Sequence, residues 1–266
     1  MENSSIKNVI LMGRKPGATT ALEHLISKGI GIKFVVAPQA EDHAATLRDA
    51  ALRYNIPVFS DDAEVYRMIH AANPLVADID LVISYLYWNK IKKPLIDLPA
   101  LGCVNFHPAP LPEYKSRAGY NTAILDGKKE FGASAHFIDS EDFDSGPIIS
   151  VKKFSIDPER ETAHSLEKKT QEALLELFKE VMEVFLAGDE IAVRPNEGGL
   201  YLTQKQLEKL KEINPEDSLE DINAKVRAFF FPPYSGAKIR VKGKDFTLID
   251  DDILGYIHEV MKSQSL

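Results

Sequence analysis

Apolar and polar positions alternate in a regular way along the first 140 residues. Short apolar runs, rich in Val and Ile, occupy 9–12, 33–37, 81–84 and 103–106, and each predicts a buried strand. Three longer segments carry apolar residues three or four positions apart and end in Gly or Asn, as amphipathic helices do. These segments cover 19–29, 41–55 and 61–73. Strands that alternate with helices indicate a mostly parallel sheet with helices on both faces.

The second half of the chain first continues this pattern and then departs from it. Strands are expected at 133–138 and 147–156, and a long amphipathic helix is expected at about 162–187. Beyond residue 192, Lys, aromatic residues and turn signals become more frequent, and "KVRAFFFPPYSGAKIRVKGKDFTLI" predicts a hairpin. The expected architecture is α/β: a Rossmann-like domain over 1–190, followed by a small C-terminal α+β subdomain over 191–266.

Charge and composition restrict the partners of this chain. A net charge of −8 and an isoelectric point near 5.5 disfavour binding to a nucleic-acid backbone, which usually requires a basic surface. No apolar stretch approaches the roughly 20 residues of a membrane-spanning helix, and the first residues do not resemble a secretory signal. The single cysteine, Cys103, lies in an apolar run, which favours a buried thiol. We therefore expect a soluble cytoplasmic protein that binds small molecules and neither nucleic acid nor membranes.

Two polar side chains stand at the end of the fourth predicted strand. In "CVNFHPAPLPEY", residues 103–114, Asn105 and His107 are two positions apart and so project to the same side of an extended strand. An amide at such a strand end is able to donate a hydrogen bond to a developing oxyanion. A histidine titrates near neutral pH and suits general base catalysis. The prolines that follow stiffen the adjacent backbone. By itself, such an Asn-x-His pair is more often structural than catalytic.

An acidic loop after the next expected strand supplies possible partners for this pair. The segment "HFIDSEDFDSGPII" contains His136, Asp139, Glu141, Asp142 and Asp144. A carboxylate from this loop would orient His107 and stabilise its protonated form. For Glu141 and Asp142, a solvated acidic turn is the simpler interpretation. A metal site built from His107, His136 and two aspartates competes with this idea, but no closely spaced histidine pair supports it, so no metal is expected. Whether the Gly13–Gly17 turn, which fits neither common phosphate-binding motif, receives an anion stays open.

Taken together, these segments resemble the signature of folate-dependent formyltransferases. That signature is N-x-H with a Pro/Leu-rich segment, then A-I-x-x-G, G-x-[TS]-x-H and D-x-G-x-I, and all its pieces occur in order within 105–148. "DLVISYLYWNKIKKPLI" is similar to the segment that lines the folate site in that family. The resemblance covers most of residues 5–190. It implies transfer of a formyl group from the co-substrate 10-formyltetrahydrofolate to an amine.

The resemblance also implies roles for individual residues. His107 would accept the proton of the attacking amine, Asn105 would bind the oxyanion, and Asp144 would hold and tune His107. The implied folate-binding residues are Trp88, Asn89, Lys90, Ile91, Val104, Ile138, Asp139 and Asp142. The family's usual S-L-L-P reads Ala-Pro-Leu-Pro over 109–112, and the Arg-Gly that commonly follows reads Lys-Ser, which points to a change on the acceptor side.

Among the branches of this family, the sugar N-formyltransferases fit best. "HPAPLPEY", "GYNTAIL" and "VRAFFFPPYSGAKI" are similar to segments of that branch, whose acceptors are amino-sugars linked to nucleoside diphosphates. Methionyl-tRNA formyltransferases are longer and need a basic face. Glycinamide ribonucleotide formyltransferases lack a C-terminal subdomain, and the hydrolases that use water carry a further N-terminal domain. A non-catalytic folate-binding module is another alternative. The aromatic-rich C-terminal region is a possible homodimer contact.

Overall fold

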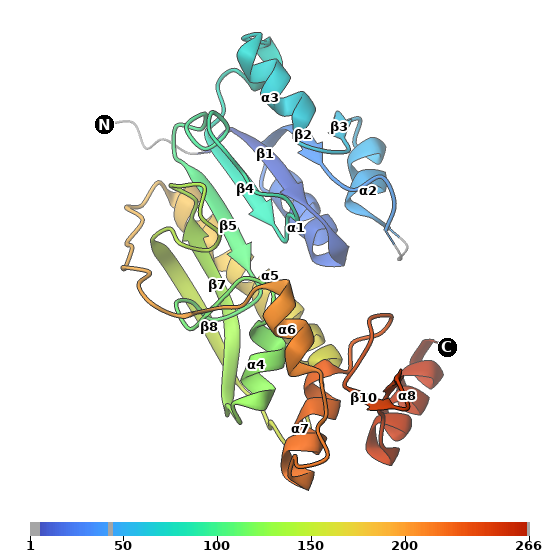
Figure 1. Cartoon of the computed structure of the whole chain (residues 1–266). Helices are drawn as coiled ribbons and strands as arrows, with labels where there is room; N and C mark the ends of the chain where they lie inside the picture. Colours follow the sequence, from blue (N-terminus) through green and yellow to red (C-terminus); the bar gives the residue numbers. More distant parts are fainter. Residues whose placement is uncertain (1–5, 42–44, 265–266) are drawn as a thin grey trace. The chain divides into compact units, whose positions relative to one another are not determined.

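The computed structural model describes residues 6–41 and 45–264 (Figure 1). The strands are β1 (Asn8–Gly13), β2 (Gly31–Val36), β3 (Val58–Phe59), β4 (Leu81–Tyr85), β5 (Cys103–His107), β6 (Tyr114–Lys115), β7 (Glu130–Phe137), β8 (Ile148–Ser155), β9 (Leu200–Tyr201), β10 (Lys238–Val241) and β11 (Lys244–Thr247). The helices are α1 (Lys15–Ser27), α2 (Leu47–Arg53), α3 (Ala63–His70), the short 3-10 helix η1 (Pro74–Val76), α4 (Gly119–Leu125), α5 (Ala163–Ala187), α6 (Gln204–Leu210), α7 (Leu219–Phe229) and α8 (Asp251–Gln264).

The central sheet has the strand order β3-β2-β1-β4-β5-β7-β8 within the described residues. The pairs β2/β3, β1/β2, β1/β4 and β4/β5 are parallel, and β7 is antiparallel to β5. This arrangement confirms the predicted α/β fold with a mostly parallel sheet. The antiparallel strand β7 is important for the site, because every second side chain of β7 lies beside a side chain of β5 on the same face of the sheet.

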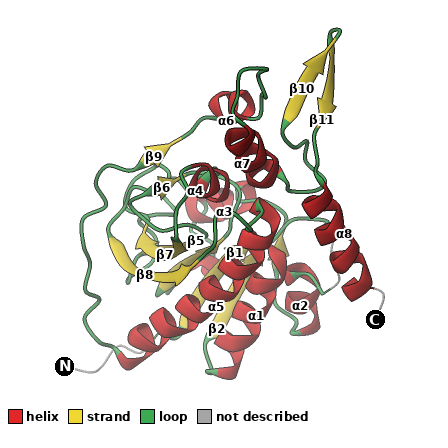
Figure 2. Ribbon diagram, turned by 90° about the horizontal axis from the view of Figure 1, so that it is seen from below, coloured by secondary structure: helices red, strands yellow, loops and turns green. Residues whose placement is uncertain are grey.

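Alternating residues of the strands enter two hydrophobic clusters, one on each face of the sheet. Val9 and Leu11 of β1 pack with side chains of α1, α2 and α5, and these three helices lie together on one side of β1 and β2 (Figure 2). Ile10 and Met12 point to the other face, where they pack with α3 and the segment around Leu95. Both faces are therefore buried, which explains why the strands read as continuous apolar runs rather than as alternating ones.

The helix expected at 41–55 begins later in the structure, at Leu47. The side chain of Thr46 accepts a hydrogen bond from the Asp49 amide and so caps the first turn, as threonine commonly does. Residues 42–44 of the expected helix lie outside the described residues. The long helix expected at about 162–187 is α5, and its apolar face supplies Leu174, Leu177 and Phe178 to the core.

The chain divides into two compact units whose segments interleave along the sequence. Unit 1 comprises Met1–Lys115, Gly132–Lys153 and Gln171–Gly199, and unit 2 comprises Ser116–Phe131, Phe154–Thr170 and Leu200–Leu266. In unit 2, α4 packs against α7, and β10 pairs with β11 as the expected hairpin. The predicted division into domains 1–190 and 191–266 follows the change in composition along the sequence and stays a prediction. Among the described helices, none combines the length and apolar character needed to cross a bilayer.

Candidate active site

Three neighbouring strands of unit 1 bring polar side chains together on one face of the sheet. In the register, Asn105 of β5 lies opposite Ser84 of β4 and His136 of β7, and His107 lies opposite Ser134. Side chains of residues two positions apart share a face of a strand. The five side chains therefore lie on the face opposite α1 and α5, near the carboxyl ends of β4 and β5, where sheets of this type bind ligands.

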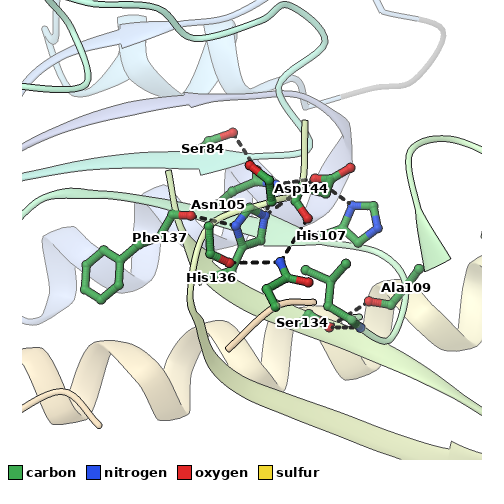
Figure 3. A network of polar contacts seen from close by, with 12 residues as sticks. Ser84, Asn105, His107, Ala109, Ser134, His136, Phe137 and Asp144 are labelled. Atoms are coloured by element: carbon green, nitrogen blue, oxygen red, sulfur yellow. Dashed lines mark hydrogen bonds and ion pairs between the residues drawn. The ribbon is translucent and has the colours of Figure 1, made fainter. Parts of the chain in front are cut away.

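His107 meets an acceptor at each ring nitrogen. Its Nδ1 lies 3.3 Å from Oδ1 of Asp144, and its Nε2 lies 3.0 Å from the carbonyl oxygen of Tyr114 (Figure 3 shows the first contact). A neutral imidazole carries one N–H and satisfies one of these acceptors, whereas the protonated ring donates to both. His107 is 5% exposed, so its ring is almost completely shielded from solvent. The two contacts therefore stabilise the ring after it has taken up a proton.

Burial works against that protonated form. Removal from water lowers the pKa of His107 below the ordinary value of 6.5, while the Asp144 carboxylate raises it, the neighbouring His136 lowers it and the Tyr114 carbonyl raises it. The burial effect is the largest, so the pKa of His107 is lowered on balance. At neutral pH the imidazole is therefore uncharged and able to accept a proton.

We expect the imidazole of His107 to titrate below pH 6.5 in the folded protein, as followed by NMR with the His107→Asn variant to assign the signals. In the unfolded chain the pKa of His107 is about 6.5. Between that pH and the folded-state pKa, the unfolded chain binds more protons than the folded one. The stability contributed by neutral His107 is therefore present above pH 6.5 and is lost as the pH falls. A midpoint above 6.5 would contradict this assignment.

The amide of Asn105 has a defined orientation. Ser84 Oγ donates a hydrogen bond to Oδ1 of Asn105 at 2.7 Å, which turns Nδ2 towards His136 Nε2, at 3.0 Å, and Asp144 Oδ1, at 3.2 Å (Figure 3). His136 Nδ1 lies 2.7 Å from the carbonyl oxygen of Phe137 and therefore donates to it, so Nε2 accepts from Asn105. Both N–H groups of the Asn105 amide thus point to the centre of the cluster.

Asp144 reaches this centre from the turn between β7 and β8. Its φ of 50° lies in the left-handed region, which Asp adopts more readily than most residues. At Gly146 a Cβ atom would lie 2.0 Å from the carbonyl oxygen of Phe137, so only glycine lets this turn pack against the end of β7. The Asp144 side chain is 9% exposed and its Oδ1 also lies 3.5 Å from His136 Nε2. The Asp-Ser-Gly sequence therefore delivers a nearly buried carboxylate to both histidines.

The Pro-rich segment after His107 is fastened to β7 by a buried serine. Ser134 Oγ donates to the carbonyl oxygen of Ala109 at 2.8 Å and accepts from the Leu111 amide at 2.8 Å (Figure 3). These bonds fix the course of the chain towards Tyr114, whose carbonyl oxygen contacts His107. The fully buried side chain of Ser134 thus adds to the stiffness expected from the prolines.

The segments predicted to contact folate follow β4 and β7. The ammonium of Lys90 lies 5.8 Å from the centroid of the Phe143 ring, which brings the two segments together. Trp88, Lys90 and Ile138 are half-buried, Asn89, Asp139 and Asp142 are exposed, and Ile91 and Val104 are buried. Val104 packs in the hydrophobic core, so its side chain takes no part in a surface site. Folate contact by the other residues stays a prediction.

The structure thus brings Asn105, His107 and Asp144 together, as predicted, and adds three residues to them. Ser84, Ser134 and His136 were not among the predicted site residues. His136 and Ser134 belong to the G-x-[TS]-x-H pattern, which was a usable signal, whereas nothing in the sequence marked Ser84. In the Gly13–Gly17 turn, the carboxylate of Glu41 accepts a hydrogen bond from the Lys15 amide at 2.7 Å, so one possible anion donor is already used.

This arrangement suits proton transfer beside a group that develops negative charge. It offers a neutral imidazole backed by a carboxylate, next to an oriented amide with two N–H groups. No set of three or more His, Cys, Asp or Glu side chains within the described part of the chain has the arrangement of a metal site. Acyl transfer to a nucleophile with a removable proton is the reaction class that such a cluster serves.

Comparisons with known proteins identify the acyl group. The model of a family described as formyl transferase matches residues 2–182. A GDP-perosamine N-formyltransferase from Brucella melitensis is 31% identical over 251 residues, which are 92% of this chain and 93% of the relative. A methionyl-tRNA formyltransferase from Thermotoga sp. is 26% identical over 269 residues, covering 95% of this chain and 83% of the relative.

A solved structure shares the fold. The N-formyltransferase from Helicobacter canadensis, in a complex with folinic acid and dTDP-3-aminofucose, matches with a TM-score of 0.71 and 19% identity, over 90% of this chain and 85% of that one. The family model covers well over half of the sequence, and the residues of its signature meet in one cluster. The chain therefore belongs to the formyl transferase family and is a formyl-transferring enzyme.

Proposed function

We propose that this enzyme transfers the formyl group of 10-formyltetrahydrofolate to the amine of a nucleotide-linked amino-sugar. The observation that carries the proposal is the cluster of Asn105, His107 and Asp144 in a chain aligned almost end to end with a GDP-perosamine N-formyltransferase. The fold shared with a protein that binds folinic acid and dTDP-3-aminofucose supports it. The net charge of −8 favours a small acceptor over the methionyl-tRNA of other relatives.

In the proposed reaction, the amine nitrogen of the sugar attacks the formyl carbon of the folate and forms a C–N bond. His107 takes a proton from that nitrogen, and the Asn105 amide donates to the oxyanion of the tetrahedral intermediate. The intermediate then expels N10 of the folate, which takes up a proton. The products are the N-formyl sugar and tetrahydrofolate. Asp144 stabilises the imidazolium between the two proton transfers.

Two contacts of the free protein set conditions for this reaction. His107 Nε2 faces the Tyr114 carbonyl oxygen, and its Nδ1 faces Asp144. The acceptor amine must therefore take the place of the Tyr114 carbonyl at Nε2. Both N–H groups of Asn105 are likewise engaged, and the oxyanion must replace one of their partners. The longer contact, 3.2 Å to Asp144, is the one more easily replaced.

The proposed folate contacts lie on the segments that follow β4 and β7. The segments around Lys90 and Phe143 contact each other, and Phe143 directly precedes Asp144 in the sequence, so these segments are the proposed folate contacts, with Trp88, Asn89, Ile91, Ile138, Asp139 and Asp142. The fully buried Val104 would contribute through its backbone only. The homodimer contact through the C-terminal region stays a prediction.

Incubation with 10-formyltetrahydrofolate and a panel of acceptors tests the proposal. The panel contains GDP-perosamine, dTDP-3-aminofucose, methionyl-tRNA and water alone. We expect tetrahydrofolate to form only with a nucleotide-linked amino-sugar, and mass spectrometry to find that sugar carrying one added formyl group. Equal turnover in water alone would identify a hydrolase, turnover with methionyl-tRNA would reassign the acceptor, and folate binding without turnover would contradict catalysis.

A further inference from the structure

The chain after α5 returns to the candidate site as a short strap, residues 194–199. Its beginning is fixed to β8, because Arg194 and Ile148 exchange two backbone hydrogen bonds of 2.9 Å each. Near its end, Gly199 lies so close to the Pro-rich segment that a Cβ atom would be 1.7 Å from the carbonyl oxygen of Pro112. The ammonium of Lys115 also donates to the carbonyl oxygen of Asn196 at 3.2 Å. The strap thus contacts β8 and the Pro-rich segment that follows His107.

The side chain of Asn196 holds the turn that carries Asp144. Its Nδ2 donates to the carbonyl oxygen of Asp144 and to that of Gly146, each at 2.9 Å. The two bonds span the turn from one side of Ser145 to the other, and they use both N–H groups of the amide. The opposite orientation of the amide would place Oδ1 against two carbonyl oxygens, so the contacts define the orientation.

The orientation that lets Asn196 donate both hydrogen bonds leaves its side-chain oxygen in an unfavourable environment. The Oδ1 atom of Asn196 is buried and has no hydrogen-bond partner among the described residues. A buried acceptor without a donor is unfavourable, and in a native structure it calls for an explanation. The turn also holds Asp144 at a φ of 50°, a conformation that persists only where the surroundings enforce it. The two donated bonds supply that enforcement.

We propose that Asn196 is a positioning residue that fixes the turn of Asp144 and thereby the contact between the Asp144 carboxylate and His107. The inference rests on the proposed function, since it assigns Asn196 a role in the same site through Asp144. The contact to be preserved is the 3.3 Å separation of His107 Nδ1 and Asp144 Oδ1. Asn105 and His136 meet the same carboxylate oxygen and depend on the turn in the same way.

Replacing Asn196 with alanine tests this role by kinetics and by NMR. We expect kcat to fall by about 10- to 100-fold, since a misplacement of roughly 1 Å costs on this scale, while KM for the folate stays close to the wild-type value. Two titratable groups face His107: Asp144 raises its pKa and His136 lowers it. A displaced Asp144 therefore moves the protonation midpoint of His107 to lower pH. Asn196→Gln retains the amide and should recover part of both losses.

Asn121→Ala is the matched control. Asn121 is also half-buried and donates through Nδ2 to a backbone carbonyl, that of Ala228 at 2.7 Å, but both residues belong to unit 2. The Asn121→Ala variant should have a lower thermal stability and an unchanged protonation midpoint of His107. Wild-type kcat and midpoint in Asn196→Ala, or an equal shift of the midpoint in Asn121→Ala, would overturn the inference. If Asn196→Ala does not fold, Asn196→Ser and Asn196→Gln are judged by the same two readouts.

The proposed function and this inference fail in different ways. If the wild-type enzyme formylates no amino-sugar, the proposed function fails, and the midpoint of His107 in the Asn196 variants still decides the positioning role. If the wild-type enzyme is active and Asp144→Ala is crippled while Asn196→Ala is normal, the inference alone is wrong.

Discussion

Replacing His107 with asparagine is expected to lower kcat by roughly 100- to 10,000-fold, the range that a positioned general base contributes. Asparagine is smaller than histidine, but its amide nitrogen lies near the position of Nδ1 and is able to donate to Asp144, so one of the two contacts of the ring is kept. It cannot, however, take up a proton near neutral pH. Because the side chains proposed to bind folate lie on other segments, and Val104 would contribute only through its backbone, KM for the folate should change little. Steady-state kinetics at saturating acceptor, with a folate-binding titration, measure both quantities.

The control for this variant is His70→Asn. His70 is an exposed residue of α3, so its replacement makes the same chemical change outside the cluster and should leave kcat unchanged. Near-normal turnover by His107→Asn would show that another group accepts the proton. In that event His136 is the next candidate, since it is the only other imidazole in contact with Asp144 among the described residues.

Much of the sheet follows from the sequence because its strands are buried on both faces. The Val- and Ile-rich runs at 9–12, 81–84 and 103–106 all became strands of the parallel part of the sheet. The antiparallel direction of β7 did not follow, since an apolar run carries no information about the direction of its neighbour. The helices α4, α6, α7 and α8 were also not predicted individually, because their segments are short or mixed in polarity.

The candidate site was predictable to the extent that it lies on one strand. Asn105 and His107 share a face by the two-residue period of a strand, which is a physical argument. Asp144 was selected from five neighbouring polar residues by the family pattern and not by spacing alone. Ser84 could be assigned to the site only once the register of β4 against β5 was known. The contact of Asn196 with the turn of Asp144 joins residues that are 52 positions apart. Such contacts depend on the tertiary fold, and no local pattern reports them.

Replacing Asp144 with asparagine is expected to lower kcat by about 100- to 10,000-fold, by the reasoning that applies to the aspartate of catalytic triads. Asparagine has nearly the same shape and tolerates the left-handed φ of 50°, so the turn is retained and only the charge is lost. Since the carboxylate raises the pKa of His107, its loss lowers that pKa further. The acid limb of the kcat/KM profile should therefore move to lower pH. The rival variant is Asp142→Asn: if it alone were crippled, the carboxylate would be misassigned.

The double variant His107→Asn/Asp144→Asn decides whether Asp144 acts through His107. Asp144 Oδ1 contacts Nδ1 of His107, and the same oxygen also accepts from the Asn105 amide. If the carboxylate serves only to hold and charge-stabilise the imidazole, Asp144→Asn costs nothing further once His107 is replaced, because residues that act as a unit are not additive. If the losses multiply instead, Asp144 acts mainly on Asn105 and the oxyanion. We expect the first result, because a charge 3.3 Å from an imidazole that becomes protonated favours the state after proton transfer, while the same charge near an oxyanion opposes it.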